Sequence, residues 1–421
     1  MRYLIVGAGP AGVVAAESLR QQDKASDIAL IGEEPEPPYS RMAIPYLLRE
    51  RIKEDGTYLR KSLSYFEDKN IEIVEDCVTD VSASRSSIVL SSGKDLSYDR
   101  LLIAAGSHPT SPPIDGIDLL GVHPCWTLAD ARAIAARAKP DAKVVLMGAG
   151  FIGCIILEAL AARGVNLTVV ELENRMVPRM MNEISGGLIK RWCKERGVRV
   201  LTSTRVEGIA GGQHLDVCLS GDQTLEADLV ISATGVQPNT DFLKGSGVEV
   251  DHGILVDHHL KTSCDNIYAA GDICQGRDFS TGDYSVQAIQ PTAVEHGKLA
   301  ATNMVGGNAL VHRGCLNMNI LDTMGLISTS FGAWEGVDGG QSVELSDPES
   351  YRYLDLQFQD DVLVGANALG LTEHVGVIRG LIQTKLRLGK WKERLLKNPL
   401  ELMEAYVAVA HGVSDGNISE T

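Results

Sequence analysis

Apolar positions follow one pattern twice along the chain. The stretches YLIVGAGPAGVVAAESLRQQ, from Tyr3, and KVVLMGAGFIGCIILEALAARG, from Lys143, each begin with an apolar run of strand length. A glycine-rich turn comes next, and small and apolar residues then recur at helical spacing. Each helix is followed by a second aliphatic run that ends in acid, IALIGEE and LTVVELE. The pattern predicts two strand–turn–helix–strand units, which are typical of parallel sheets covered by helices.

The turn of each unit has the spacing G-x-G-x-x-G. Its glycines are Gly7, Gly9 and Gly12 in the first unit and Gly148, Gly150 and Gly153 in the second. The first glycine permits a tight turn, the second lets the backbone approach a pyrophosphate, and the third lets the helix pack on the strand. The helix N-terminus donates N–H groups to phosphate, and an acid at the end of the next strand accepts from ribose hydroxyls. Two copies in the same context predict two dinucleotide-binding sites.

The rest of the chain adds strands and helices of other kinds. LLIAAGSHP and LVISATGVQPN predict strands that end where the chain crosses between domains, and NIYAAGDICQG predicts a strand ending at Asp272. QPTAVEHGKLAATNMVGG predicts a helix. From about residue 310, YRYLDLQFQDDVLVGANALG predicts antiparallel strands with a hairpin at Asp360-Asp361. HVGVIRGLIQTKLRLGKWKERLL and NPLELMEAYVAVA predict terminal helices.

Composition narrows the class of protein. The 421 residues suggest about three domains. Hydrophobic residues make up 44% of the chain, which argues against global disorder, and the net charge of -16 argues against nucleic acid or an anionic membrane as a partner. No apolar run approaches 18 residues, so no membrane span is expected. The first residues read as a buried strand rather than a signal peptide, so the expected compartment is the cytoplasm.

The chain has eight cysteines: Cys77, Cys125, Cys154, Cys193, Cys218, Cys264, Cys274 and Cys315. No two of them have C-x-x-C spacing, and the sequence shows no cluster of cysteines with histidines. The sequence therefore predicts neither a metal site nor an iron–sulfur cluster, and it favours scattered thiols in a reducing compartment.

Together with the ATG-like motifs at Ala104-Ala105-Gly106 and Ala233-Thr234-Gly235 and the AAGD motif, these features resemble the FAD-dependent pyridine nucleotide–disulfide oxidoreductases. The resemblance covers nearly the whole chain. It implies an α/β fold with two Rossmann-like dinucleotide-binding domains and an α+β C-terminal interface domain. The implied bounds are 1–110 and 241–309 for an FAD domain in two parts, 111–240 for the NAD domain, and 310–421 for a domain that forms a homodimer.

Within the family, EEPEPPYSR resembles ferredoxin reductases, rubredoxin reductases, apoptosis-inducing factor and the large subunit of NADH-dependent nitrite reductase. The resemblance implies that Glu33 and Glu34 face the adenosine ribose of FAD, and that Arg41 pairs with the pyrophosphate unless it is an exposed loop charge. Asp272 would bind the ribityl hydroxyls. The implied cofactor-binding residues are Gly7, Gly9, Pro10, Ala11, Gly12, Glu33, Glu34, Arg41, Tyr46, Val78, Ala105, Gly106, Gly148, Gly150, Phe151, Ile152, Gly153, Glu171, Gly235, Gly271, Asp272, Ile289 and Gln290.

The sequence departs from the family pattern at four positions. The redox cysteine of the disulfide-reducing branches aligns with Met42, which forms no thiolate. A Lys and a Glu that pair beside the flavin in ferredoxin reductases align with Tyr46 and Ile155, and the aromatic residue that covers the flavin aligns with Leu321. Tyr46 would either stack near the flavin or simply pack. These departures predict a flavin enzyme without a redox disulfide.

Glu171 decides the expected choice of nicotinamide cofactor. A carboxylate after this strand accepts from a free ribose 2′-hydroxyl and repels a 2′-phosphate. The nearby Arg175 does not follow the strand directly. NADH is therefore expected over NADPH.

The segment GLIQTKLRLGKWKERLLKN is basic in an acidic chain, with Lys385, Arg387, Lys390, Lys392, Arg394 and Lys397. It is either the exposed face of a packing helix or a docking patch for an acidic redox protein. The function expected is NADH:acceptor oxidoreductase, with FAD passing electrons to an iron–sulfur protein or rubredoxin. No catalytic side chain is assigned, because hydride transfer requires none. The alternatives are an NADH oxidase that uses oxygen or a small molecule, and a redox sensor or assembly protein that binds FAD and NADH.

Overall fold

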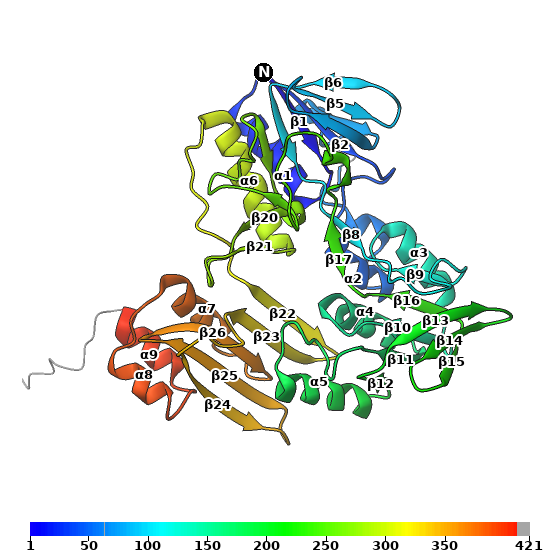
Figure 1. Ribbon diagram of the computed structural model, residues 1–421, viewed down its shortest axis with the longest axis vertical. Coiled ribbons are helices and arrows are strands. Elements are labelled where there is room, and N and C mark those ends of the chain that lie inside the picture. The colour runs from blue at the N-terminus through cyan, green and yellow to red at the C-terminus, as the bar shows by residue number, and fades with distance from the viewer. Residues whose placement is uncertain (63, 411–421) are drawn as a thin grey trace, which may run out of the picture.

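The structure is a computed structural model that describes residues 1–62 and 64–410. Its elements form three bodies, seen in Figure 1 as an upper one, a lower right one and a lower left one. The upper body combines two chain segments that are distant in sequence, because strands within residues 2–103 share one sheet with the strand at residues 267–269. Among the described residues, no helix is both long and apolar enough to cross a membrane.

The upper body is built on a parallel sheet with strand order β19-β7-β1-β2-β3. Its strands are β1 (Arg2–Val6), β2 (Asp27–Gly32), β3 (Ile71–Glu75), β7 (Arg100–Ile103) and β19 (Ile267–Ala269). The central strands are apolar on both faces because helices and loops cover both sides. Helix α1 (Pro10–Gln22) packs on helix α6 (Gln290–Gly306) so closely that a Cβ atom at Gly297 would lie 2.2 Å from the Ala11 carbonyl oxygen.

Smaller elements surround this sheet. An antiparallel sheet contains β4 (Val78–Ser82), β5 (Ser87–Leu90) and β6 (Asp95–Ser97). A mixed sheet contains β18 (Ile254–Leu255), β20 (Cys274–Arg277) and β21 (Tyr284–Val286), with β18 parallel and β21 antiparallel to β20. Short helices are η1 (Arg41–Ala43), α2 (Ile44–Leu48), η2 (Glu54–Thr57), η3 (Glu67–Lys69), η4 (Asp241–Leu243) and η5 (Gly271–Ile273). The strands β8 (Ser107–Pro109) and β17 (Val236–Pro238) pair where the chain passes to the lower right body and returns.

The lower right body repeats the parallel architecture with strand order β12-β11-β10-β16-β9. Its strands are β9 (Val122–Pro124), β10 (Lys143–Met147), β11 (Asn166–Val170), β12 (Arg199–Leu201) and β16 (Leu229–Ser232). Its helices are α3 (Leu128–Arg137), α4 (Phe151–Ala161) and α5 (Glu183–Glu195), and an antiparallel meander adds β13 (Val206–Gly211), β14 (Leu215–Leu219) and β15 (Gln223–Ala227). The predicted pair of Rossmann-like units is confirmed.

The lower left body is an antiparallel sheet with helices at one end, the predicted α+β arrangement. Its strands are β22 (Met318–Thr323), β23 (Leu326–Gly332), β24 (Gln341–Asp347), β25 (Arg352–Gln359) and β26 (Val362–Leu369), followed by α7 (Val375–Thr384), α8 (Lys390–Leu395) and α9 (Leu402–Ala410). The hairpin predicted at Asp360-Asp361 is confirmed, since Gln359 pairs with Val362. Residues 411–421 of the predicted last domain lie outside the described residues.

Two sequence expectations about element ends are wrong. The strand expected to reach Asp272 stops at Ala269, because Gly271 takes a left-handed conformation with φ 80° and starts the turn η5. The long helix expected across the basic segment is two helices. Lys385, with φ 51°, ends α7, and α8 starts only at Lys390.

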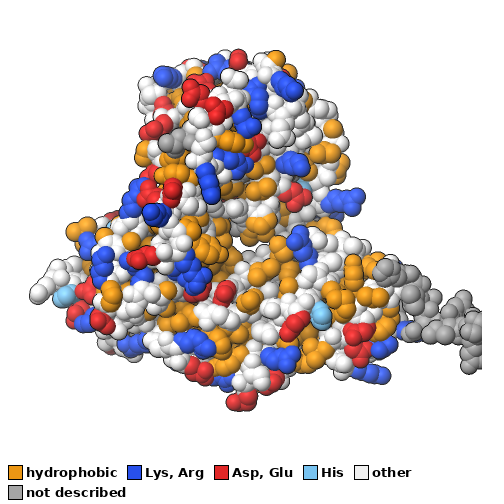
Figure 2. All heavy atoms as spheres, turned by 180° about the vertical axis from the view of Figure 1, so that it is seen from behind, with side chains coloured by type: hydrophobic (Ala, Val, Ile, Leu, Met, Phe, Trp, Pro, Cys, Tyr) orange, Lys and Arg blue, Asp and Glu red, His pale blue; other side chains and the backbone are white. Residues whose placement is uncertain are grey.

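Figure 2 shows the molecule from behind, with acidic and basic side chains interspersed rather than separated by sign. On this face, the acidic side chains are thus not gathered into one patch. A basic segment can act locally on such a surface, because exposed charges more than a Debye length of about 8 Å apart are largely screened at physiological salt.

Candidate functional site

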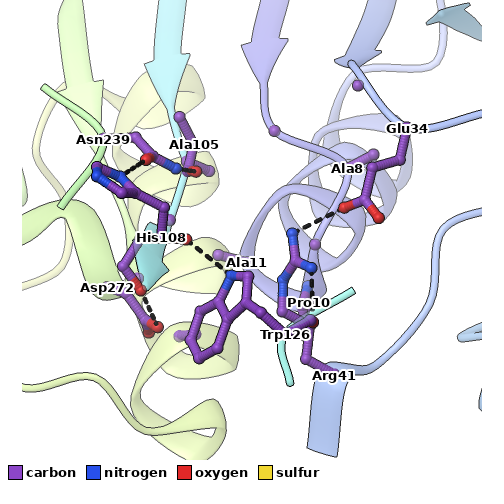
Figure 3. A pocket seen from close by; sticks show the side chains of 18 of the residues that line it. Ala8, Pro10, Ala11, Glu34, Arg41, Ala105, His108, Trp126, Asn239 and Asp272 are labelled. Atoms are coloured by element: carbon purple, nitrogen blue, oxygen red, sulfur yellow. Dashed lines mark hydrogen bonds and ion pairs between the residues drawn. The ribbon is translucent and has the colours of Figure 1, made fainter. Parts of the chain in front are cut away.

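A cavity of about 500 Å³ opens at the carboxyl ends of the strands of the upper sheet. Its wall is formed by the β1–α1 turn, the end of β2 and the loop up to Pro45, the end of β7, the Gly271 turn, and the first residues of α4 and α6. Figure 3 shows side chains from these separate segments pointing toward one space. Parallel sheets place ligands at this edge.

Most of the predicted cofactor-binding residues line this cavity. They are Gly7, Gly9, Pro10, Ala11, Glu33, Glu34, Arg41, Val78, Ala105, Gly106, Phe151, Ile152, Gly271, Asp272 and Gln290. Tyr46 does not line it, because its side chain points outward and is 51% exposed. Ile289 lines a separate, smaller cavity beside it. Gly12, Gly148, Gly150, Gly153, Glu171 and Gly235 also lie outside the wall.

The β1–α1 turn has the backbone geometry that its glycines predict. A Cβ atom at Gly7 would lie 2.1 Å from the Ala104 carbonyl oxygen, and one at Gly12 would lie 1.9 Å from the Gly7 carbonyl oxygen. Gly9 has no atom within 4 Å of a Cβ position and faces open space. Helix α1 has no side-chain cap at its N-terminus, so its first N–H groups remain available to an anion. The turn fits a pyrophosphate.

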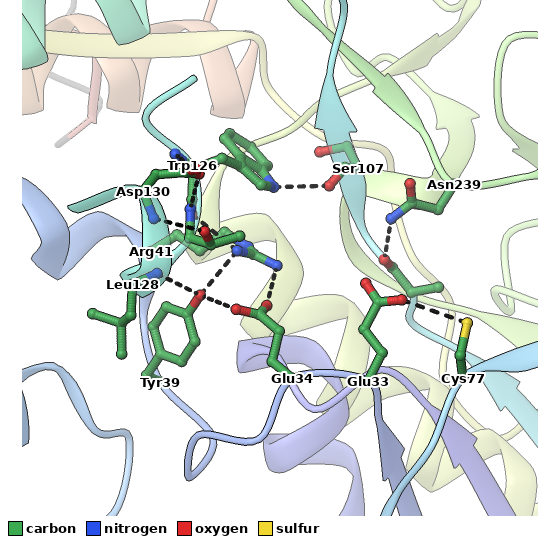
Figure 4. Close-up of polar contacts among 12 residues, drawn as sticks. Glu33, Glu34, Tyr39, Arg41, Cys77, Ser107, Trp126, Leu128, Asp130 and Asn239 are labelled. Atoms are coloured by element: carbon green, nitrogen blue, oxygen red, sulfur yellow. Dashed lines mark hydrogen bonds and ion pairs between the residues drawn. The ribbon is translucent and has the colours of Figure 1, made fainter. Parts of the chain in front are cut away.

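Arg41 is held in the cavity wall and is not a free loop charge. Its guanidinium forms an ion pair with Glu34 at 2.8 Å and donates to the Tyr39 hydroxyl at 3.0 Å and the Trp126 carbonyl oxygen at 2.9 Å. Tyr39 in turn donates to Glu34 at 2.6 Å. Burial raises the pKa of Tyr39, so the phenol stays protonated as this donor. Figure 4 shows this network at one end of the cavity, while the Glu33 carboxylate accepts from the Cys77 thiol at 3.5 Å.

Asp272 is a largely buried acid at the opposite end of the cavity. Its carboxylate accepts one hydrogen bond within the protein, from the Ser107 hydroxyl at 3.2 Å. Burial raises the pKa of this carboxyl, because the loss of water outweighs the Ser107 hydrogen bond and the attraction of Arg41. A ligand that brings hydroxyl donors would satisfy the remaining lone pairs, and the ribityl chain of FAD has such hydroxyls. The site therefore fits the predicted ribityl contact.

The polar rim of the cavity contains residues that the sequence patterns missed. His108 Nδ1 lies 2.5 Å from Asn239 Oδ1, and Asn239 Nδ2 donates to the Ala105 carbonyl oxygen at 2.7 Å. Trp126 Nε1 donates to the Ser107 carbonyl oxygen at 3.0 Å. His108 lies two residues after Gly106 and Asn239 lies four residues after Gly235, at strand ends that could have marked them. Trp126 had no comparable signal.

The position that holds the redox cysteine in other branches is Met42, and it lines the cavity. Ile155 lines it as well, whereas Leu321 is buried in a separate apolar cluster with α4. Two thiols, Cys77 and Cys125, reach the wall. Burial raises the pKa of both, that of Cys125 to about 12, so neither thiol is a reactive thiolate near neutral pH.

The second glycine turn, between β10 and α4, has the same geometry as the first. A Cβ atom at Gly148 would lie 2.4 Å from the Ala233 carbonyl oxygen, one at Gly153 would lie 2.2 Å from the Gly148 carbonyl oxygen, and Gly150 faces open space. The predicted nucleotide-binding turn at residues 148–153 is thus formed in the same way on the second sheet.

Glu171 follows β11 beside this second turn. Its two carboxylate oxygens accept from the Ala149 N–H at 2.6 Å and the Glu173 N–H at 2.9 Å. Arg175 points elsewhere, because its guanidinium donates to the carbonyl oxygens of Met181 and Pro178. The charge next to the ribose position is therefore negative, which favours a 2′-hydroxyl over a 2′-phosphate.

The expectation that no cysteine clusters with histidine is wrong. The fold brings Cys315 together with His296 and His312, and their donor atoms all lie within 4.8 Å of one another. The H-R-G-C spacing of His312 and Cys315 was a signal in the sequence, but His296 joins them only through the tertiary structure.

Comparison with known proteins agrees with this geometry. Residues 1–297 match the family described as pyridine nucleotide-disulphide oxidoreductase. The chain belongs to this family. It is an FAD-dependent NAD(P)H oxidoreductase, in line with the two glycine turns and the acids that follow them.

Three relatives span most of this oxidoreductase. The epsilon subunit of an NADH-dependent phenylglyoxylate dehydrogenase from Aromatoleum evansii is 31% identical over 95% of each chain. An NADH oxidase from Methanocaldococcus jannaschii is 34% identical over 73% of this chain and 71% of the relative. The crystal structure of a ferredoxin reductase from Rhodopseudomonas palustris is 25% identical with a TM-score of 0.86, covering 96% of this chain and 99% of that one.

The first prediction concerns Asp272. The substitution Asp272→Asn removes the charge and keeps the shape of the side chain. At pH 7.5, the FAD-free variant should therefore unfold at the same temperature as the FAD-free wild type or at a higher one. The sign follows from the raised pKa, since the ionised carboxylate costs folding free energy once the pH exceeds that pKa. The affinity for FAD, measured by fluorescence titration, should nevertheless fall at least about tenfold, or roughly 1.4 kcal/mol. The exposed Asp265→Asn serves as control, and unchanged FAD affinity in Asp272→Asn would remove this residue from the site.

The second prediction concerns Glu171. In Glu171→Gln, the ratio of kcat/KM for NADH to that for NADPH should fall about tenfold, because the repulsion of a 2′-phosphate is lost. The adjacent and exposed Glu173→Gln should keep the wild-type ratio. A wild-type enzyme that prefers NADPH would contradict the role assigned to Glu171.

Proposed function

We propose that the chain is an NADH:acceptor oxidoreductase that passes electrons to a small iron–sulfur protein or rubredoxin. One observation carries the first half of this proposal. Phe151 and Ile152, which lie between Gly150 and Gly153 of the second glycine turn, line the cavity at the first glycine turn. A dinucleotide on each turn would therefore extend into one shared space, which hydride transfer between two cofactors requires.

The proposed division of the chain follows the sheets. Residues 1–110 and 241–309 hold FAD, residues 111–240 hold NADH, and residues 310–421 form the interface domain. The parallel sheet that combines β19 with β7 and β1 supports a first domain in two parts, because the strand at residues 267–269 completes a sheet begun at residue 2.

The proposed FAD site uses the cavity from end to end. Glu33 and Glu34 lie at the adenosine ribose, the Gly9 turn and Arg41 at the pyrophosphate, and Asp272 at the ribityl chain. FAD supplies the conversion from a two-electron donor to a one-electron acceptor. The protein binds both nucleotides and orients them. Gln290, the first residue of α6, lines the cavity, so the N-terminus of this helix faces the cavity.

Two observations support the proposed electron acceptor: the cavity wall has no thiol at position 42, and relatives of the chain include a ferredoxin reductase. Met42 stands where a disulfide-reducing member carries a thiol, so electrons leave without a cysteine relay. The ferredoxin reductase of Rhodopseudomonas palustris, which shares the fold over 99% of its length, supports an iron–sulfur protein as acceptor. The NADH oxidase of Methanocaldococcus jannaschii supports the second candidate, an NADH oxidase that uses oxygen or a small molecule.

The basic segment from Lys385 to Lys397 is the proposed docking site for an acidic redox protein. Its first residue is near the cofactor region, because Lys385 Nζ lies 4.8 Å from the centre of the Phe279 ring. Phe279 follows Asp278, which lines the smaller cavity, and Ala288 is shared by the smaller and the larger cavity. Arg394, at the other end, pairs with Glu401 at 2.8 Å and covers Trp391, so it contributes to packing.

A homodimer in a reducing, cytoplasmic compartment completes the proposal. Leu400, Met403 and Val407 expose an apolar stripe at helical spacing along and before α9, a surface that a second copy would cover. All eight cysteines are unpaired, which suits a reducing compartment.

The third prediction tests the absence of a redox disulfide. Anaerobic titration of the purified enzyme with dithionite should consume two electrons per FAD, because flavin is the only two-electron centre proposed. Alkylation of accessible cysteines should leave NADH-to-ferricyanide activity largely unchanged. Uptake near four electrons would show a redox-active cysteine pair and a different electron route.

The fourth prediction tests the docking segment. The double variant Lys385→Glu/Arg387→Glu should lower kcat/KM for an oxidised iron–sulfur protein or rubredoxin as acceptor severalfold and weaken its dependence on salt, because steering by opposite charge is lost. Ferricyanide reduction should not change. The matched charge reversals Lys139→Glu and Arg199→Glu, exposed positions on the NADH-binding body, should have little effect on either acceptor.

Two outcomes would contradict this assignment. Equal loss with both acceptors would mean that the substitutions damage packing around Phe279. Fast oxygen consumption, with no turnover on any iron–sulfur protein or rubredoxin, would establish the oxidase alternative.

A further inference from the structure

Three side chains with metal-binding chemistry converge beside the cofactor cavity. His296 lies in α6, and His312 and Cys315 lie in the segment between α6 and β22. His296 Nε2 is 3.2 Å from Cys315 Sγ, and His312 Nε2 is 3.7 Å from the same sulfur. The two imidazole rings meet edge to face, with centroids 4.7 Å apart. None of the three lines the cavity assigned to FAD.

Burial keeps all three groups neutral. His296 is 4% exposed and His312 is 8% exposed. Desolvation lowers the pKa of both histidines, that of His296 to about 3, and raises the pKa of the Cys315 thiol to about 12. Neutral imidazole is the form that binds a metal ion, so the histidines need no deprotonation near neutral pH. Only the thiol has to release a proton.

The two nitrogen–sulfur separations suit a tetrahedral ion, whereas the two imidazole nitrogens, within 4.8 Å of each other, would have to approach to about 3.3 Å. With Zn–S near 2.3 Å and Zn–N near 2.0–2.1 Å, neighbouring donors around Zn²⁺ lie about 3.3–3.6 Å apart. The observed nitrogen–sulfur distances of 3.2 and 3.7 Å bracket this range. Two imidazoles and a thiolate select zinc over calcium or magnesium, which prefer oxygen ligands.

We infer that His296, His312 and Cys315 form a binding site for one Zn²⁺ ion. The ion forms bonds to His296 Nε2, His312 Nε2 and Cys315 Sγ, and the thiol proton goes to solvent. No electrons are transferred, because zinc is not redox-active. A water molecule completes four-coordination.

The ion would add a link between parts of the chain that already contact each other, since the Asn303 side chain of α6 donates to the Leu310 carbonyl oxygen and accepts from the Leu310 N–H. Helix α6 starts at the cofactor cavity, and the segment that carries His312 and Cys315 leads into β22 of the lower left body. One contact opposes binding. The Gly271 N–H lies 3.4 Å from His296 Nδ1, which must carry a proton when Nε2 binds the ion, so this long hydrogen bond is lost. The affinity is reduced by that loss but gains from the convergence of three ligands.

The test uses the full chain with FAD bound. After chelator treatment and removal of the chelator, the enzyme is titrated with Zn²⁺ in competition with a chromophoric chelator, and bound zinc is counted by elemental analysis. One equivalent should bind, and it should raise the unfolding temperature. In Co²⁺ difference spectra, a thiolate-to-metal charge-transfer band and ligand-field bands of tetrahedral intensity should appear.

Variants separate this site from nonspecific binding. Cys315→Ser and His312→Gln should each weaken zinc binding about 100-fold, and Cys315→Ser should abolish the charge-transfer band, while FAD content stays at the wild-type level. His258→Gln removes an exposed histidine adjacent to His259, and Cys218→Ser removes an exposed thiol. Both controls should bind zinc as the wild type does.

Any one of three results would overturn the inference. The first is a zinc stoichiometry well below one, and the second is a Co²⁺ spectrum without a thiolate band. The third is a zinc affinity that changes less than about threefold in both Cys315→Ser and His312→Gln. A loss of zinc binding in His258→Gln alone would place the ion at the exposed histidine pair instead.

Discussion

The close approach of backbone to backbone at the glycine turns is the constraint on which the rest of the structure depends. Gly7 lies against the end of β7, and Gly12 lies against Gly7 itself, with no room for a Cβ atom at either position. This contact places the N-terminus of α1 directly above the carboxyl ends of β1 and β7. The same contact recurs between Gly148, Gly153 and Ala233 in the second sheet. Each sheet therefore presents a helix N-terminus to the space at its edge.

Charged side chains lie at the two ends of the main cavity. At one end, Glu34, Tyr39 and Arg41 satisfy one another, so the guanidinium is oriented before any ligand arrives. At the other end, the Ser107 hydroxyl donates to the Asp272 carboxylate. In the proposed FAD site, the oriented guanidinium would serve the charged pyrophosphate, and the buried acid would serve the chain of hydroxyls.

Burial sets the protonation state of the thiols and imidazoles in and beside the cavity. The thiols of Cys77 and Cys125 line the cavity wall, and burial raises their pKa and holds them protonated. The same desolvation at His296 and His312 keeps two imidazoles neutral beside Cys315. Neutral imidazoles are ready to bind a metal ion, whereas the Cys315 thiol must first release a proton that burial helps it to retain.

The sequence by itself determined the two parallel sheets, the glycine turns, the acids that follow them, and the antiparallel C-terminal sheet with its hairpin at Asp360-Asp361. These features depend on local periodicity and on glycines whose conformation no other residue adopts easily. Tertiary structure alone decided that Phe151 and Ile152 reach the first cavity, that Tyr46 points away from it, and that Trp126 and Asn239 complete its rim. It also ended the expected strand at Ala269 and brought His296 to Cys315. Such outcomes depend on how distant segments pack, and one chain's residue pattern does not encode the angle between its domains.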